Sequence, residues 1–337
     1  MLFLLQNKGF KNLDNLSAKI IELSQGVYVI PGSTNVGVIT SYEDSCTQVY
    51  LIDSGCTEID GEYVLDVIKA FFNLEDKEFK IKALISTHCH ADHVGGHNYI
   101  KDECHCQIYA SKHERGCMET PMIQCTTLWG GYPPHEFRTL YFKPQETEVD
   151  VIIGQEDSIP LSDNRTLTFM ELNGHSYQEI VPIITNNDGR KVLFAGDAIF
   201  PRGEILEHWI PLIVNPVEFM DSLDKLCAIE NVDWCIPGHG DFLSKNILEA
   251  AEMNKIAIMS TRMAILDALK NNKKMTCEEI VKYVADKNNM EMTMPQWAMV
   301  GSSVRSYLSV MHDAREIRMK VEKNLLYFYI EEKKERN

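Results

Sequence analysis

Over residues 1–245, apolar residues come in short runs that end at glycine, proline or charged residues. Runs of this length, rich in valine, isoleucine and tyrosine and bounded by turn residues, predict β-strands. The predicted strands cover residues 26–32, 35–40, 48–55, 81–87, 107–111, 166–172, 179–185, 191–200 and 234–240.

Between these runs, apolar residues recur every three or four positions, which is the spacing of an amphipathic helix. Helices are predicted at residues 62–74, 95–103 and 216–229. Residues 114–137 show little periodicity and contain prolines and glycines, so this segment is predicted to be irregular. Strands that alternate with helices predict a layered α/β protein.

The C-terminal part has a different pattern. Residues 250–272, 276–288 and 295–314 are three amphipathic segments in succession, and the second opens with the capping-box pair Thr276 and Glu279. Two apolar runs around a polar turn follow within residues 316–330 and predict a hairpin. Three helices and a hairpin predict a small winged-helix-like domain at residues 246–337, after a larger domain at residues 1–245.

Composition and charge narrow the class of protein. The chain is 45% hydrophobic and 24% charged, as globular proteins are, and no run approaches the about 20 apolar residues of a membrane span. The first ten residues are too short an apolar stretch for a signal peptide, and ten cysteines are scattered along the chain. These features predict a cytoplasmic protein with free thiols and no membrane partner.

The net charge of −16 is unevenly spread, because residues 250–337 hold 15 basic and 12 acidic residues. The acidic remainder would repel nucleic-acid phosphate. The third C-terminal helix, residues 295–314, has one arginine and no lysine, which argues against a duplex-DNA reader. Its apolar residues are too many for one face, so it should pack on the main body or on a second subunit, and a homodimer is predicted.

Candidate metal ligands are most closely spaced at residues 86–97, STHCHADHVGGH, directly after a predicted buried strand. His88 and His90 are two residues apart, so both rings can point to the same side at the end of a strand. Asp92 and His93 follow at once. A tetrahedral metal site has about four ligands, and a catalytic site leaves one position open. This loop therefore offers enough ligands for two metals, provided that further ligands come from elsewhere.

Further candidates do lie downstream. His175 in NGHS, Asp197 in AGDA and His239 in PGHG each stand in a loop beside a predicted strand. Together with Asp53 in LIDSG and the HCHADH motif, these segments resemble the metallo-β-lactamase superfamily, in the same order along the chain. The resemblance covers residues 20–245 and implies an α/β fold built as a four-layer αβ/βα sandwich with a two-metal site on one edge.

The resemblance also implies a role for each residue of the motifs. The first metal would be bound by His88, His90 and His175, and the second by Asp92, His93 and His239. Asp197 would bridge the two metals, and Asp53 would support the loops by hydrogen bonds. Nitrogen and oxygen ligands of this kind suit zinc, while Mn or Fe would also fit.

Two such metals point to hydrolysis. A water molecule shared by two cations loses a proton near neutral pH, and the resulting hydroxide attacks an acyl carbon or a phosphorus. The metals stabilise the developing oxyanion. Asp92 could orient the hydroxide and pass its proton to the leaving group, which makes it the predicted catalytic residue.

Details of the motifs separate branches of the family. The β-lactamases usually carry cysteine where Asp197 stands, and the flavodiiron proteins carry glutamate in place of His90. The segments AGD and PGHG look most like the glyoxalase II, lactonase and thioesterase branch, while the C-terminal helices look like those of lactamase-β-like-2 type hydrolases. A small ester, thioester or lactone is the predicted substrate. A ribonuclease acting on single-stranded RNA and a mononuclear-iron oxidoreductase like the sulfur dioxygenases are the alternatives.

Candidate substrate-binding residues lie in two places. Trp129 and Tyr132 fall in the irregular segment where this superfamily often has a lid, and their rings could pack on an acyl group. His208 and Trp209 lie between the fourth and fifth motifs, which suggests that they are near the metals.

Overall fold

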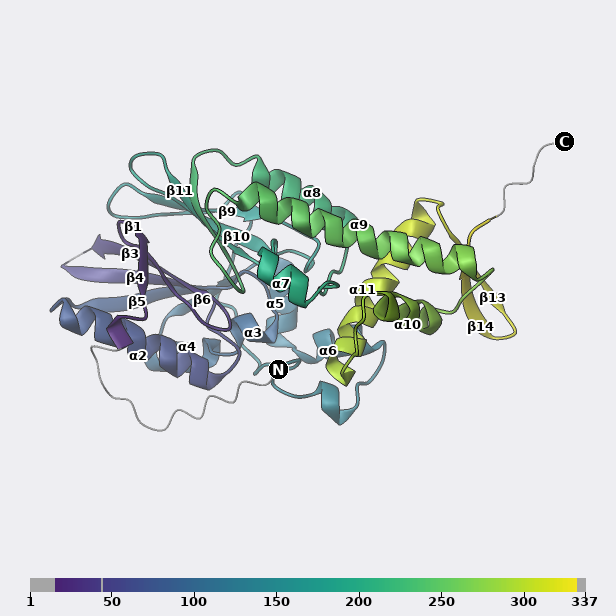
Figure 1. The fold of residues 1–337 in the computed structure, drawn as a ribbon. Helices are drawn as coiled ribbons and strands as arrows, with labels where there is room; N and C mark the ends of the chain where they lie inside the picture. Colours follow the sequence, from purple (N-terminus) through teal and green to yellow (C-terminus); the bar gives the residue numbers. More distant parts are fainter. Residues whose placement is uncertain (1–15, 44, 332–337) are drawn as a thin grey trace.

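Two β-sheets form the centre of the computed structural model, which describes residues 16–43 and 45–331 (Figure 1). The first sheet contains, in spatial order, β1 (Ile21–Ser24), β2 (Val27–Ile30), β3 (Val36–Glu43), β4 (Cys46–Ile52), β5 (Phe79–Ile85), β6 (Gln107–Ala110) and β7 (Val151–Ile152). It is antiparallel from β1 to β4 and parallel from β4 to β7.

The second sheet has the order β12 (Val232–Pro237), β11 (Lys191–Gly196), β10 (Ile180–Thr185), β9 (Thr166–Glu171) and β8 (Ser158–Pro160). Only β11 and β12 in this sheet are parallel. The strands predicted from the sequence are present in the two sheets, and β1, β7 and β8 are additional.

Alternating side chains on single strands divide the molecule into layers. On β4, Val49 and Leu51 pack into a core with α2 (Glu58–Leu74) and α4 (His97–Cys104), whereas Tyr50 and Ile52 face the second sheet. On β11, Val192 faces the first sheet, whereas Leu193 packs toward α8 (Pro216–Cys227) and α9 (Ile247–Asn271). Successive strand residues point to opposite faces, so each sheet is covered on both sides. The predicted four-layer sandwich is confirmed.

The prediction of an irregular segment at residues 114–137 is wrong. The structure has α5 (Lys112–Glu119), α6 (Met122–Trp129) and the 3₁₀ helix η1 (His135–Phe137) there. Pro121 directly precedes α6, where a proline costs the helix no hydrogen bond, and Gly130 ends α6 with φ of 79°. The proline and glycine residues therefore separate short helices, and each helix is too short to show a clear helical period of apolar residues. Two further short helices, α3 (Ala91–Val94) and α7 (Arg202–Glu207), were not predicted.

The C-terminal part contains the predicted three helices and hairpin. They are α9, α10 (Cys277–Lys287), α11 (Met294–Asp313), β13 (Arg318–Glu322) and β14 (Leu325–Tyr329). Figure 1 shows α9 running from the outer layer of the sandwich to the C-terminal helices. One continuous apolar core extends from Leu172 beside the second sheet to Tyr307 on α11. The domain boundary near residue 245 and the winged-helix-like character of this part stay predictions.

Helix α11 packs on α10 and also contacts α6 and α8. The rings of Trp129 on α6 and Trp297 on α11 have centroids 6.1 Å apart. Part of the apolar surface of α11 therefore packs on the main body.

The first ten residues, for which the sequence predicts no signal peptide, lie outside the described residues. Among the described helices, none has the length and apolarity needed to cross a bilayer.

Candidate metal centre

The residues of the motifs meet at one edge of the sandwich. Asp53 follows β4, the HCHADH loop follows β5, Asp197 follows β11, and His239 follows β12. His175 lies in the loop that joins β9 to β10. The seven predicted ligands form three overlapping groups with ligand atoms within 4.8 Å of one another. The first group is His88, His90 and His175, the second is Asp92, His93 and His239, and a third, formed by His88, His93 and Asp197, connects these two.

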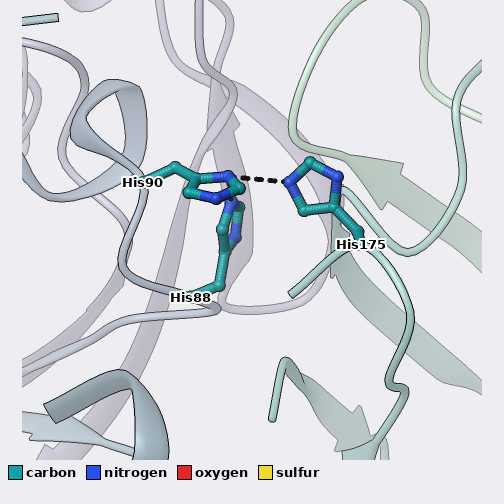
Figure 2. Close-up of side chains that lie close together, drawn as sticks. All are labelled: His88, His90 and His175. Carbon is teal, nitrogen blue, oxygen red and sulfur yellow. Dashed lines mark hydrogen bonds between the residues drawn. The ribbon is translucent and has the colours of Figure 1, made fainter. Parts of the chain in front are cut away.

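The first group consists of three histidines whose rings point toward one another, as Figure 2 shows. His90 Nδ1 lies 3.0 Å from His88 Nε2 and 2.8 Å from His175 Nε2. Three ring nitrogens converge on one small region, and each can offer a lone pair. This is the arrangement expected of ligands around a single cation.

The second group combines a carboxylate with two histidines. His239 Nε2 is 3.2 Å from Asp92 Oδ2 and 3.3 Å from His93 Nε2. His93 is fully buried, whereas Asp92 and His239 are partly exposed. This side of the centre is therefore open to solvent.

Asp197 lies between the two groups. Its Oδ2 is 3.3 Å from His175 Nε2, and its Oδ1 is 3.4 Å from His93 Nε2 and 3.5 Å from His239 Nε2. Oδ1 is buried and has no hydrogen-bond partner within the described residues. A buried, unsatisfied carboxylate oxygen is costly unless a cation compensates it. The residues present therefore fit a pair of metals that share Asp197.

Contacts behind the histidines determine which ring nitrogen is free. The Nδ1 atoms of His93, His175 and His239 lie 2.8 Å from Asp53 Oδ2, 2.8 Å from the Leu212 carbonyl oxygen and 2.6 Å from the Ser33 carbonyl oxygen. Each of these acceptors takes the ring proton on Nδ1, so Nε2 is the nitrogen that faces the centre, and it offers a lone pair there when the ring is neutral. Such contacts orient metal-binding histidines and raise their basicity.

Asp53 connects two parts of the motif loop. Its carboxylate accepts hydrogen bonds from the Thr87 backbone N–H and the Thr87 hydroxyl, each at 2.8 Å, in addition to the His93 ring. Its backbone has φ of 61°, in the left-handed region that aspartate tolerates better than most residues. This conformation turns the chain sharply at the end of β4 and aims the carboxylate at the loop after β5.

The two groups differ in their electrostatics. Burial lowers the pKa values of His88 and His90 and brings that of His175 to about 3, so these rings are neutral at pH 7, as metal ligation requires. Burial opposes the charged form of His239 too, but Asp197 and Asp92 raise its pKa to about 9. The carboxylates thus draw positive charge into the second group.

One glycine leaves the space that the centre needs. A Cβ at Gly238 would lie 2.5 Å from Asp197 Oδ1 and 2.5 Å from His93 Cε1. Any side chain at position 238 would therefore displace residues of the centre.

His97, the last histidine of residues 86–97, belongs to none of the three groups. Its ring nitrogens lie 2.6 Å from Ser54 Oγ and 2.8 Å from Ser86 Oγ, so it links the loops after β4 and β5.

Two buried glutamates were missed by the sequence reasoning. Glu179 accepts the Asp197 backbone N–H at 2.7 Å and lies 3.5 Å from His88 Nδ1. Glu114 on α5 accepts the backbone N–H of Cys89 at 2.9 Å and that of Gln178 at 3.0 Å. It therefore joins the loop of His88 and His90 to the loop of His175. A glutamate at the start of a buried strand was a signal for Glu179, while Glu114 had none.

The predicted substrate residues lie in different surroundings. His208 is exposed at the end of α7, and Trp209 is partly buried against the core. Tyr132 is exposed and accepts a hydrogen bond from Arg138 at 2.9 Å, while Trp129 packs on Phe137 and on α11.

Tyr141, which was not predicted, lies within electrostatic reach of two of the candidate ligands. Burial and the nearby charges of Asp92 and Asp197 raise the pKa of its hydroxyl. Its ring is half-exposed and packs on Phe142, with centroids 4.9 Å apart.

Comparisons with known proteins agree with this geometry. Residues 29–239 match the family model described as the Metallo-beta-lactamase superfamily. The hydroxyacylglutathione hydrolase of Prochlorococcus marinus strain NATL1A is 26% identical over 172 residues, which cover 49% of this chain and 54% of the relative. The chain thus aligns with about half the length of the curated relatives it matches.

Solved structures resemble the fold over almost the whole chain. A beta-lactamase domain protein from Burkholderia ambifaria has a TM-score of 0.69 and 16% identity, with 93% of each chain covered. A metallo-beta-lactamase family protein from Thermus thermophilus has a TM-score of 0.68 and 16% identity, with 92% of this chain and 100% of the other covered. At such identities the likeness shows the fold alone, and its extent includes the C-terminal helices.

Proposed function

The chain belongs to the metallo-β-lactamase superfamily, whose members are generally metal-dependent hydrolases, and on that premise we propose that it hydrolyses a small ester, thioester or lactone with two divalent metals. The observation that carries the proposal is the position of Asp197, whose two carboxylate oxygens face different histidines of the two groups. A carboxylate in this position would connect the two sets of ligands into one centre.

The residues that would hold the metals follow from the groups. His88, His90 and His175 would bind the first metal, Asp92, His93 and His239 the second, and Asp197 both. Nitrogen and oxygen donors of this kind suit zinc. When bound, such metals supply an activated water and positive charge for the oxyanion that develops in the transition state.

Asp92 is the proposed catalytic residue of the chain itself. Its carboxylate is partly exposed on the open side of the centre, and one of its oxygens is 3.2 Å from His239 Nε2. In this position Asp92 can orient the attacking water and move a proton toward the leaving group. His93, held by Asp53, and His175, held by the Leu212 carbonyl, keep the geometry fixed while this happens.

Two features favour an acyl substrate. The curated relatives, of which the chain matches about half the length, are hydroxyacylglutathione hydrolases, and their name describes the hydrolysis of an acyl compound. In addition, the Tyr141 hydroxyl lies within electrostatic reach of Asp92, and Trp129 exposes part of its ring. A polar donor and an exposed aromatic ring suit a small acyl compound.

The test is reconstitution of metal-free protein. Protein loaded with Zn²⁺, Mn²⁺ or Fe²⁺ is assayed on esters, thioesters, lactones and single-stranded RNA, and its metal content is measured by elemental analysis. We expect two metals per chain and turnover of an acyl substrate that Asp92→Asn lowers by about 100-fold or more. Cleavage of RNA with a steep salt dependence would favour the ribonuclease instead. One iron per chain would favour an oxidoreductase.

We further propose that the protein is a homodimer in the cytoplasm. Ile256, Met259 and Met263 form an exposed apolar stripe on one face of α9, and all ten cysteines are free. Exposed apolar stripes are typical of association surfaces, and free thiols of reducing compartments. Light scattering should give twice the mass of one chain, and the variant Met263→Glu should give a monomer. A wild-type monomer would contradict the dimer.

A further inference from the structure

The loop that carries His175 is fastened to a segment at residues 211–215. The Leu212 carbonyl oxygen accepts the proton of His175 Nδ1 at 2.8 Å. The backbone N–H groups of Val214 and Asn215 both donate to the Gly174 carbonyl oxygen, at 2.8 and 2.9 Å. The orientation of the His175 ring therefore depends on where residues 211–215 lie.

This segment is in turn held by helix α11. Ser303 is fully buried, and its Oγ accepts the Ile213 backbone N–H at 3.0 Å. The single proton of this hydroxyl has two acceptors within reach, the Pro211 carbonyl oxygen at 3.0 Å and the Met299 carbonyl oxygen of its own helix at 3.2 Å. One hydroxyl thus contacts the backbone on both sides of Leu212.

We propose that Ser303 is a positioning residue for His175, so that the C-terminal helix α11 sets the affinity of the first metal. The inference rests on the proposed two-metal centre. Ser303 contacts the backbone of residues 211 and 213. Leu212, which lies between them, accepts the proton of His175 Nδ1. The other ring nitrogen of His175, Nε2, faces His90 in the first group. Each of these contacts is buried or partly buried, where a hydrogen bond left without a partner is costly.

The sequence distance explains why no motif shows this link. Ser303 is separated from the metallo-β-lactamase motifs by α9 and α10 and stands in a helix of ordinary amphipathic pattern. Outer contacts of metal-binding histidines typically change metal affinity by about 10–100-fold when they are lost. Because Ser303 acts through the Leu212 backbone, we expect a loss of about tenfold, at the low end of that range.

The experiment measures metal affinity one group at a time. The substitution His239→Ala removes a ligand of the second group and leaves the first group intact. The substitution His90→Ala removes a ligand of the first group and leaves the second group intact. Metal-free proteins are titrated with Co²⁺ in competition with a chelator, with and without Ser303→Ala. We expect Ser303→Ala to weaken Co²⁺ binding by about tenfold in the first background and to leave it unchanged in the second.

Matched variants separate positioning from general packing. Val304→Ala shortens a fully buried neighbour on α11 but keeps the Ser303 hydroxyl and its contacts with residues 211 and 213, and it should leave Co²⁺ affinity at the wild-type value. Ser303→Thr and Ser303→Val add the same bulk and differ in the hydroxyl, so only the valine variant should lose affinity. The comparison of Ser303→Thr with Ser303→Val also tests the proposal if Ser303→Ala folds poorly. Hydrogen exchange of the Ile213 amide should speed up in the alanine and valine variants.

The two hypotheses fail in different ways. Wild-type protein that binds no Co²⁺ would refute the two-metal centre and this inference together. If the wild-type protein binds two ions but the variants Ser303→Ala and Val304→Ala bind Co²⁺ with equal affinity, the inference about Ser303 is refuted and the two-metal centre is not. An equal loss in Ser303→Thr and Ser303→Val would also refute it, because the hydroxyl would then be irrelevant.

Discussion

Substitution of Glu114 tests how firmly the two loops of the first metal group are joined. Glu114 is 2% exposed, and its two carboxylate oxygens each accept one backbone N–H, from Cys89 and from Gln178. Glu114→Gln keeps the size of the side chain but replaces one oxygen by an NH₂ group, which cannot accept. One buried N–H then loses its acceptor and faces another donor.

The magnitude follows from that single lost contact. A hydrogen bond to a carboxylate contributes about 1.5–3 kcal/mol, and an unpaired buried donor costs a similar amount. We expect Glu114→Gln to lower the free energy of unfolding by about 2–3 kcal/mol. Taken at about 2 °C per kcal/mol for a large chain, this corresponds to a Tm lower by about 4–6 °C.

Thermal unfolding followed by circular dichroism, with metal-free and Zn²⁺-loaded protein, measures both consequences. If Glu114 also aligns His88 and His90 with His175, the rise in Tm on Zn²⁺ loading should be smaller in the variant. The control is Glu75→Gln, where the carboxylate pairs with Lys77 at the surface and should contribute about 0.5 kcal/mol or less. A Glu114→Gln protein with the Tm of Glu75→Gln would refute the reasoning.

Four further predictions concern the centre and the C-terminal part. Asp92→Asn should lower kcat by about 100-fold or more while KM changes little, because the loss lies in proton transfer, and a near-normal kcat would remove Asp92 from the mechanism. Asp197→Ala should reduce the metal content from two ions to at most one in elemental analysis, and unchanged content would contradict the bridge. Tyr141→Phe should lower kcat/KM by about tenfold at unchanged metal content if its hydroxyl contacts substrate, whereas equal activity would place it outside the site. A chain ended after residue 245 should aggregate, because the core beside Leu172 would be exposed, and a monodisperse truncated protein would show that this core closes without α9.

The local pattern of the sequence was sufficient for most elements and for the candidate ligands. Strands buried on both faces, such as β4 and β11, appear as short apolar runs, and the HCHADH loop brings several ligand types together within a few residues. Their chemistry and order along the chain are visible without coordinates. The same approach failed at residues 114–137, since α5 and α6 are each shorter than the window in which a helical period can be recognised.

Only the tertiary structure revealed what surrounds the ligands. Glu114, Glu179 and Ser303 all act by hydrogen bonds to backbone groups of distant segments. A backbone N–H or carbonyl is the same at almost every residue, so the partner of such a bond leaves no mark in the sequence. Folding decides which of these groups are buried together, and burial is what makes each of the bonds matter. The sequence thus names the groups that can bind metal, while the packing of α5, β10 and α11 determines how they are held.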